Sequence, residues 1–278
     1  MQQITSNVYV ETQWVSGSSV LASSNSSFIT TSAGIVMIDA PMEPVNALKW
    51  RDIMAEKGEL LYLVNTEFHS DHTMGNHFFP VPVIAHEETK KWYESVCGPP
   101  EDARQKVLDR YPDSGPLVED YKLRSPTITF DENLTLHLGD HTIELIHLPG
   151  HTPGQTCVHV PSERIVFPGD NFTNALQPSL SECLPLEWLE SVDRLLDLDV
   201  DAFVPGHGEV GDKKAVREFA TFLGHCVETI GEAIEKGMEK AEAVETIEFE
   251  GVLIARHPGR DWQRKNVARL YDMLSTSA

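Results

Sequence analysis

The segment LLYLVNTEFHSDH, residues 60–72, joins a mostly apolar run to a dense group of side chains of the kinds that bind metals in proteins. Its first six residues are typical of a strand that is buried on both faces. The rest supplies four potential ligands, namely Glu67, His69, Asp71 and His72. Side chains alternate along an extended segment, so the first three point the same way and His72 points to the other side. One loop is therefore expected to supply ligands to two neighbouring ions.

Three further segments repeat this pattern, in which an apolar run ends in a Gly/Pro turn with a potential ligand. They are TIELIHLPGHTPG (residues 142–154), RIVFPGD (164–170) and DAFVPGHG (201–208), and they contribute His151, Asp170 and His207. Loops at strand ends bring groups together on a rigid frame, and imidazole and carboxylate are the usual ligands of zinc, iron and manganese. We expect all seven side chains to meet at one edge of a sheet.

The motifs EFHSDH, LPGHTPG, FPGD and VPGHG stand in this order along the chain. In sequence and order they resemble those of the metallo-β-lactamase superfamily, and the resemblance covers roughly residues 5–240. Each motif alone is weakly specific, whereas four in order are strongly so. The resemblance implies an α/β fold, the four-layer αββα sandwich of that family, with a dinuclear metal site at its edge.

The same resemblance implies which residues bind which metal. The implied ligands of the first metal are Glu67, His69 and His151. Those of the second metal are Asp71, His72 and His207, and Asp170 bridges the two. Asp71 is also the expected catalytic residue, because it would hold one ion and help to orient the nucleophile.

Glu67 departs from the family pattern, which has histidine at this position. Three interpretations remain open: Glu67 is a ligand, it swings away and leaves the first metal weak or absent, or it acts as an outer hydrogen-bonding group or general base. As a ligand it would make the cluster less positive and raise the pKa of the shared water. Two divalent ions are expected, with zinc first and iron or manganese as alternatives that a carboxylate-rich site favours.

Two further residues are candidates to support the ligands. Asp39 ends an apolar run and either orients a metal-binding histidine or simply forms a turn. Asn171 follows Asp170 and could face the cleft. Among the remaining histidines, His77 is expected to pack or cap and His147 to be structural. His86 follows the motif loop, and His225 and His257 have no evident partner in the sequence.

The chain is expected to form a single domain over residues 1–278. Short strands are predicted at 7–13, 18–23, 26–31 and 34–41, a helix at 44–57, and a strand that enters a helix over 81–88. The second half again runs from strands, over 127–170, into helices. Residues 87–125 are interpreted as a lid or insertion. The helices of residues 212–278 are either a homodimer face or the outer layer of the sandwich.

The net charge of −21 argues against nucleic-acid binding by a basic face. No apolar run approaches the length of a membrane span, and no secretory signal is visible. The scattered Cys97, Cys157, Cys183 and Cys226 are interpreted as reduced packing residues of a cytoplasmic protein.

These features predict a dinuclear metallohydrolase that acts on a small molecule. A metal-bridging hydroxide would attack an acyl carbon of a lactone, thioester, ester, or amide such as a β-lactam. An iron-dependent oxygen or redox enzyme on the same fold is the alternative. A non-catalytic binding protein is a further one, although it would be expected to have lost at least one ligand.

Overall fold

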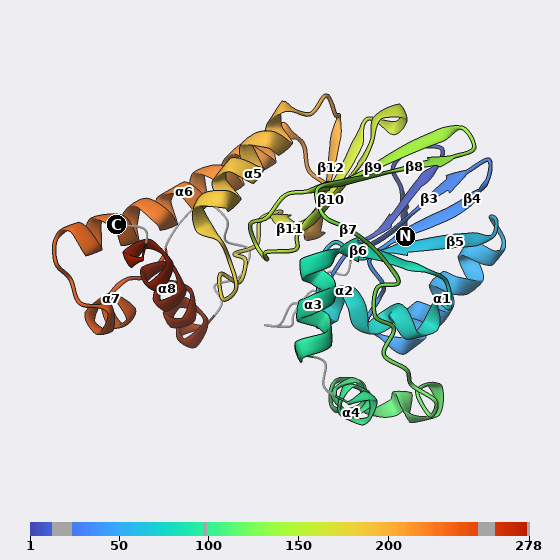
Figure 1. Cartoon of the computed structure of the whole chain (residues 1–278), viewed down its shortest axis with the longest axis horizontal. Coiled ribbons are helices and arrows are strands. Elements are labelled where there is room, and N and C mark those ends of the chain that lie inside the picture. Colours follow the sequence, from blue (N-terminus) through green and yellow to red (C-terminus); the bar gives the residue numbers. More distant parts are fainter. Residues whose placement is uncertain (13–23, 97–98, 250–258, 277–278) are drawn as a thin grey trace.

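The computed structural model describes residues 1–12, 24–96, 99–249 and 259–276, and two β-sheets packed face to face form its centre (Figure 1). In the described residues the first sheet has seven strands, paired in chain order. They are β1 (Gln2–Gln3), β2 (Val8–Glu11), β3 (Ser26–Thr31), β4 (Gly34–Ile38), β5 (Leu60–Val64), β6 (Val83–His86) and β7 (Ile128–Phe130). Strands β1 to β4 are antiparallel and β4 to β7 are parallel, so the carboxyl ends of β4 and β5 meet at one edge.

The second sheet has five strands within the described residues, in the order β12-β11-β10-β9-β8. These strands are β8 (Asn133–Leu138), β9 (His141–His147), β10 (Thr156–Val160), β11 (Ile165–Thr173) and β12 (Ala202–His207). Only β11 and β12 are parallel. The predicted hairpin over 156–170 is the β10–β11 pair. The three strands of residues 127–150 divide between the sheets, because β7 pairs with β6 while β8 and β9 form a hairpin.

Side-chain alternation produces the layers. Along β4, Val36 and Ile38 face the other sheet, whereas Ile35 and Met37 face the helices on the outside. This is the two-residue period of a pleated strand. The core between the sheets is dominated by branched aliphatic residues from both, and each sheet carries a second apolar core on its outer face. These layers confirm the predicted αββα sandwich.

Helices cover both outer faces. The first sheet carries α1 (Pro44–Ala55), and the second carries α5 (Pro185–Asp197) and α6 (Lys213–Glu235) (Figure 1). Helix α1 begins with Pro44, whose fixed φ suits the first helical position, and it buries Ala47, Trp50 and Met54 at helical spacing. The remaining helical segments are α2 (Ser70–Thr73), η1 (Met74–Phe78), α3 (Glu87–Val96), α4 (Pro100–Arg110), η2 (Pro112–Leu117), η3 (Pro161–Glu163), α7 (Lys240–Thr246) and α8 (Arg260–Ser275).

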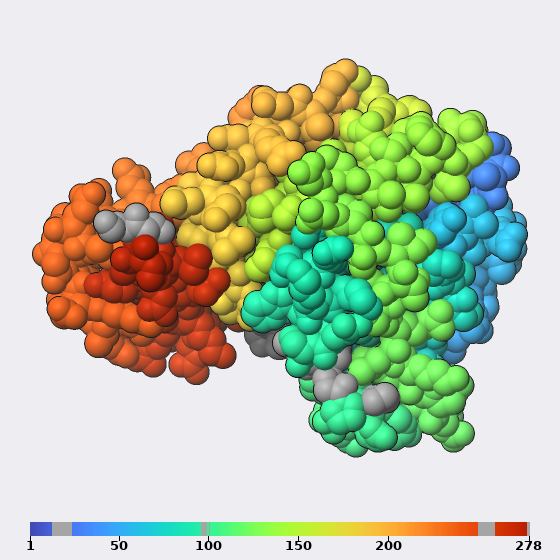
Figure 2. Space-filling model, viewed as in Figure 1, coloured from blue at the N-terminus to red at the C-terminus, as the bar shows by residue number. Residues whose placement is uncertain are grey.

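Several sequence expectations can now be placed. The strand predicted at 18–23 and the residues Cys97 and His257 lie outside the described residues. Residues 87–125 contain α3, α4 and η2, and their role as a lid stays a prediction, as does the single domain over 1–278. The helices α7 and α8 form a lobe, which a hollow separates from α3 in Figure 2. Among the described residues, no helix combines the length and apolarity that crossing a bilayer requires.

Three of the four cysteines lie in the described residues. Cys157, Cys183 and Cys226 are all buried in the core that joins the second sheet to α5 and α6, and none of them forms a disulfide. Burial raises the pKa of each thiol, to about 12 for Cys183. Neutral, buried thiols agree with the expectation of packing cysteines.

One position in the sequence expectation was wrong. Asp170 does not follow the end of its strand, because β11 continues to Thr173. Instead, the pairing of β11 with β12 shifts register on both sides of Gly169, which has φ of 56°. Such a bulge re-aims the side chain that follows, so a strand interior can present Asp170 as a loop would.

A partly buried carboxylate links the two sheets. Glu163 accepts hydrogen bonds from Thr5 Oγ1, from Asn7 Nδ2 at 2.7 Å and from His141 Nε2 at 2.9 Å. Thr5 and Asn7 lead into β2 of the first sheet, whereas His141 begins β9 of the second. Burial lowers the pKa of His141, but its bonds to Asp140 and Glu163 outweigh that effect and raise it.

We predict that Glu163→Ala lowers the free energy of unfolding by about 1–3 kcal/mol, because three donors lose a partly buried acceptor. A raised folded-state pKa means that the contribution of His141 is present below its unfolded value and is lost as the pH rises through the folded value. The difference between wild type and variant in denaturant titrations should therefore be larger near pH 6 than near pH 10. The exposed Glu228→Ala is the control, and a difference independent of pH would contradict the assignment.

Candidate metal centre

All seven predicted ligand residues converge where the carboxyl ends of β5 and β12 meet. Their potential ligand atoms form three overlapping groups, and within each group the atoms lie within 4.8 Å of one another. The groups are Glu67–His69–His151, Asp71–His72–His207 and Glu67–His72–Asp170. Residues from four separate segments, distant in sequence, thus form one compact cluster.

Asp39 orients His72. It follows β4, is buried, and has a φ of 52°, a conformation that Asp tolerates better than most residues. Its carboxylate accepts hydrogen bonds from Thr66 N at 2.8 Å and Thr66 Oγ1 at 2.6 Å, and it lies 2.8 Å from His72 Nδ1. A histidine that donates from Nδ1 presents the lone pair of Nε2, and Nε2 of His72 faces the cluster. The expected contact between Asp39 and a histidine is therefore present, and its positive φ bends the chain directly after β4.

The close approach of two strands shapes the space around Asp170. A Cβ atom on Gly206 would lie 1.8 Å from Asp170 Oδ1, so only glycine leaves room for the carboxylate there. His207 is the next residue, and its Nε2 lies 3.4 Å from Asp170 Oδ2. Gly206 of the VPGHG motif thus allows a carboxylate and an imidazole from neighbouring strands to lie against each other.

Asn171 supports a loop instead of facing a cleft. It is fully buried, its Oδ1 accepts a hydrogen bond from His151 N at 2.9 Å, and its Nδ2 donates to Leu148 O at 2.7 Å. Gly150 allows this contact, because a Cβ there would lie 2.5 Å from Asn171 Oδ1. Asn171 therefore fixes the backbone that carries His151.

Ser24 and Asn25 hold two of the ligand loops together, and the sequence reasoning missed them. Asn25 Nδ2 donates to Pro205 O at 2.9 Å and to Gly208 O at 2.8 Å, on either side of His207. Ser24 Oγ donates to Asp71 O at 2.8 Å. Neither residue belongs to a motif, so only their position in space reveals this role.

Glu67 lies at the middle of the cluster and is completely buried. Its Oε2 forms an ion pair with His69 Nδ1, and its Oε1 lies 3.4 Å from both His72 Nε2 and His151 Nε2. Burial raises the pKa of Glu67, but the three histidines outweigh that effect and lower it. Conversely, the neighbouring carboxylates raise the pKa values of His69 and His72 well above the ordinary range despite burial. The carboxylate points into the cluster and not away from it.

The other half of the cluster pairs Asp71 with His207, whose Nε2 lies 3.2 Å from Asp71 Oδ2. Burial lowers the pKa of His207, but Asp170 and Asp71 together raise it to about 10. Burial raises the pKa of Asp71, and the positive charges of His72 and His207 outweigh this and lower it. Of the three cluster carboxylates, Asp71 is the most exposed, at 21% of its side chain.

The donor set fits divalent cations. Glu67 Oε1, His72 Nε2 and Asp170 Oδ1 are buried and have no hydrogen-bond partner within the described part of the chain. Buried polar atoms are almost always satisfied, and all three face the cluster. Four imidazoles and three carboxylates around such atoms provide the ligands that zinc, iron and manganese accept.

An aromatic ledge borders the cluster. Trp92 of α3 stacks on Phe68 with ring centroids 5.3 Å apart, and Phe68 lies 4.6 Å from the ring of His69. Trp92 is 38% exposed, which is unusual for a side chain of its size. The ledge offers an apolar surface next to the predicted ligand His69.

Glu182 is another residue near the cluster that the sequence did not indicate. Its Oε2 lies 3.5 Å from His69 Nε2, on the side of the ring that faces away from Glu67. It stands in the segment between β11 and α5, where no motif marks it.

Three further histidines, His77, His86 and His147, lie outside the cluster. His86 and His147 stack on each other with centroids 3.7 Å apart, and their Nε2 atoms reach backbone carbonyls, those of Asp131 and Pro153. His77 Nδ1 accepts from Lys122 N. These contacts agree with the structural roles expected for His77 and His147.

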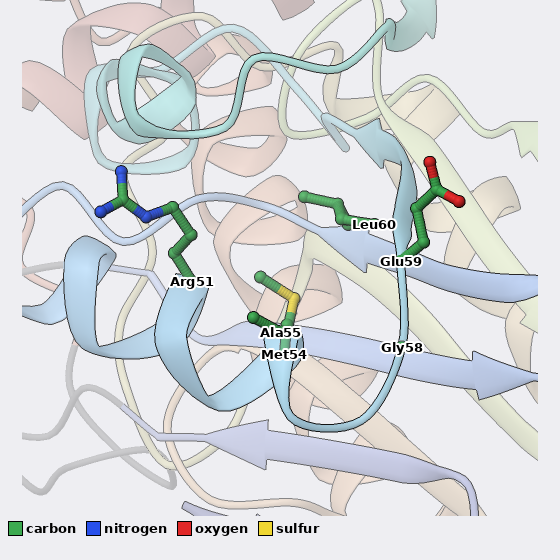
Figure 3. Close-up of a pocket in the computed structure, with 6 residues that line it drawn as sticks. All are labelled: Arg51, Met54, Ala55, Gly58, Glu59 and Leu60. Carbon is green, nitrogen blue, oxygen red and sulfur yellow. The ribbon is translucent and has the colours of Figure 1, made fainter.

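A separate shallow pocket of about 380 Å³ lies at the other end of β5 (Figure 3). It is lined by Arg51, Met54, Ala55, Gly58, Glu59 and Leu60. At about 3.3 Å per residue, the five-residue strand β5 keeps it roughly 16 Å or more from Glu67. The pocket therefore takes no part in the metal cluster.

Comparisons with known proteins agree with this geometry. The family model of the metallo-beta-lactamase superfamily matches residues 20–207. A hydroxyacylglutathione hydrolase of Mesorhizobium japonicum is 37% identical over 84 residues, which are 30% of this chain and 33% of that protein. The acyl-coenzyme A thioesterase MBLAC2 of Homo sapiens is 26% identical over 162 residues, which are 53% of this chain and 56% of that protein. The matches thus span about a third to just over half of the relatives' lengths.

A solved metallo-beta-lactamase from Pontibacter korlensis superposes with a TM-score of 0.61 and 21% identity, over 80% of this chain and 97% of that one. At this identity the likeness shows the fold. The family model matches more than half of the chain, from before β3 to His207. With its fold, its cluster and this match taken together, the chain belongs to the metallo-β-lactamase superfamily.

Proposed function

We propose that the chain is a dinuclear metallohydrolase that cleaves an acyl bond of a small molecule, with a thioester as the first candidate. The observation that carries the proposal is a group of three buried atoms, Glu67 Oε1, His72 Nε2 and Asp170 Oδ1, that face one another and have no hydrogen-bond partner in the described residues. The names of the two relatives, a hydroxyacylglutathione hydrolase and an acyl-coenzyme A thioesterase, support a thioester.

The proposed ligands of the first ion are Glu67, His69 and His151. Those of the second ion are Asp71, His72 and His207, with Asp170 within reach of both sets. When bound, two divalent ions would lower the pKa of a water nucleophile and polarise the acyl carbonyl. The 21% exposure of Asp71 suits it to orient the nucleophile, whereas Glu67, which is fully buried, can only hold its ion.

Three carboxylates give the cluster a specific charge. They offset three of the four positive charges of two divalent ions. With a histidine in place of Glu67, the two remaining carboxylates would offset only two of them. A less positive centre acidifies water less and accepts harder ions, so iron or manganese suit this site beside zinc. The same carboxylate content supports the second candidate, an iron-dependent oxygen or redox enzyme.

The surroundings favour an uncharged or apolar part of the substrate near His69. The ledge of Phe68 and Trp92 provides flat apolar surface there. The chain as a whole carries a charge of −21, so a nucleic-acid substrate is not proposed. The cytoplasmic location and the homodimer stay predictions.

We predict that Glu67→Ala lowers the metal content by about one ion per chain, because the first ion loses one of the three ligands that it does not share with the second ion. Elemental analysis after dialysis measures this. Glu67→His is the matched control, since an imidazole restores a ligand, and it should retain two ions. Unchanged metal content and activity in Glu67→Ala would refute the ligand assignment.

We further predict that hydrolysis of a thioester is abolished by a chelator and restored by added metal. A panel of thioesters, lactones and a β-lactam, each assayed with and without chelator, identifies the bond. Asp170→Ala should reduce the rate by more than the roughly 100-fold that changes outside the ligand set produce. Activity that survives complete removal of the metal would overturn the proposal, and metal-dependent oxygen uptake would favour the second candidate.

Metal affinity should fall as the pH is lowered. The raised pKa values of His69, His72 and His207 mean that the metal-free cluster holds protons near neutral pH, which a metal must displace. Apparent affinity should weaken by about tenfold per pH unit for each proton displaced. Chelator competition at pH 6 and pH 8, with proton release followed by an indicator dye, tests this. Equal affinities at the two pH values would show that the histidines bind metal without giving up a proton.

A further inference from the structure

The two ring nitrogens of His69 have different neighbours. Its Nδ1 forms an ion pair with Glu67 and lies 3.3 Å from His151 Nε2, so this nitrogen faces the metal cluster. Its Nε2 points the other way and lies 3.5 Å from Glu182 Oε2. A metal-binding histidine generally donates its other N–H to a carboxylate or carbonyl, which sets the tautomer and ring orientation. Glu182 therefore lies beside His69 as Asp39 lies beside His72. The carboxylate faces Nε2 in His69 and Nδ1 in His72.

Glu182 needs support to do this, because its side chain is 33% exposed and it stands outside any strand or helix. That support comes from helix α8. Asn266 Oδ1 accepts a hydrogen bond from Leu180 N at 2.9 Å, and Asn266 Nδ2 donates to Pro178 O at 3.2 Å. Arg269 Nη2 donates to Cys183 O at 3.0 Å, directly after Glu182. The backbone on both sides of Glu182 is therefore held by side chains of one helix.

The polar face of α8 is itself unusual. Gln263 and Asn266 are each only 1% exposed, although buried amides destabilise a protein unless they are hydrogen-bonded. They lie three residues apart on one helix face, and Gln263 Nε2 donates to Gln177 Oε1 at 2.8 Å. Val267 and Leu270 of the same helix pack into the apolar core instead. Both buried amides of α8 thus bind the segment of residues 177–183, and Gln263 Oε1 also accepts a hydrogen bond from Phe249 N at 3.3 Å.

The residue that follows this segment also contacts the loop of His151, the other histidine proposed for the first metal. Leu184 N donates to Gly150 O at 2.8 Å, one residue before His151. The segment therefore contacts His69 through Glu182 and the loop of His151 through its backbone. Among the described residues, the segment forms no comparable hydrogen bond or ion pair with Asp71, His72 or His207.

We propose that Glu182 is a positioning residue for His69, and that helix α8 places it, so that α8 sets the affinity of the first metal subsite and not that of the second. This inference rests on the proposed function, because it takes Glu67, His69 and His151 as ligands. It gives the C-terminal helix, which lies beyond the region matched by the family model, a part in building the centre.

The test measures affinities for both zinc ions by chelator competition. Glu182→Ala should weaken binding of one ion by about 10–100-fold and leave the other within about threefold. Glu182→Gln keeps an acceptor oxygen and should lose less. In a Glu67→Ala background, where the first ion is already gone, Glu182→Ala should have no further effect. The exposed Glu190→Ala on α5 is the matched control.

The contribution of α8 is tested with Asn266→Ala, which should weaken the same ion, and with the exposed Lys265→Ala on the same helix, which should not. Denaturant titrations of each metal-free variant show whether it folds. Unchanged affinities in Glu182→Ala, or equal weakening of both ions, would overturn the inference. Unchanged affinities in a folded Asn266→Ala would overturn the part assigned to α8. Wild-type protein that binds no zinc would instead refute the proposed function.

Discussion

The structure depends on one constraint, namely that ionisable groups buried at the edge of two sheets must satisfy one another or a bound cation. Glu67, His72 and Asp170 are withdrawn from water, and each has an atom with no hydrogen-bond partner within the described residues. An isolated buried charge would cost several kcal/mol, so such groups persist only where opposite charges face them. Carboxylates and imidazoles alternate in the cluster, which meets this requirement and leaves a set of lone pairs for metal.

Much of the surrounding architecture holds these groups in place. Asp39 orients a ring, Asn25 and Asn171 hold backbone on either side of ligand loops, and Gly206 leaves the space that a carboxylate occupies. None of these four touches a metal in the proposed assignment. Their common effect is that ligands from distant segments keep a fixed geometry, which binding of a small cation requires.

Glu67 connects this geometry to chemistry. Its burial and its contacts with three histidines make it the most central member of the cluster. A carboxylate there lowers the net charge of any bound pair of ions and so affects both metal preference and the acidity of water at the site. The departure from the family pattern thus changes the expected chemistry while the position in space is kept.

The sequence by itself determined the fold class and the candidate ligands, because periodicity shows which faces are buried and the potential ligands recur after apolar runs. The order of the four motifs carried the resemblance that indicated the family. It also indicated Asp39, since that residue ends an apolar run. Only the tertiary structure decided that Asp170 lies on a bulge inside β11, that Asn171 turns back to a loop, and that Ser24, Asn25 and Glu182 join the site. The physical reason is that a motif reports chemistry carried by neighbours along the chain. Contacts between residues that are 20 to 180 positions apart depend on packing, which no local pattern encodes.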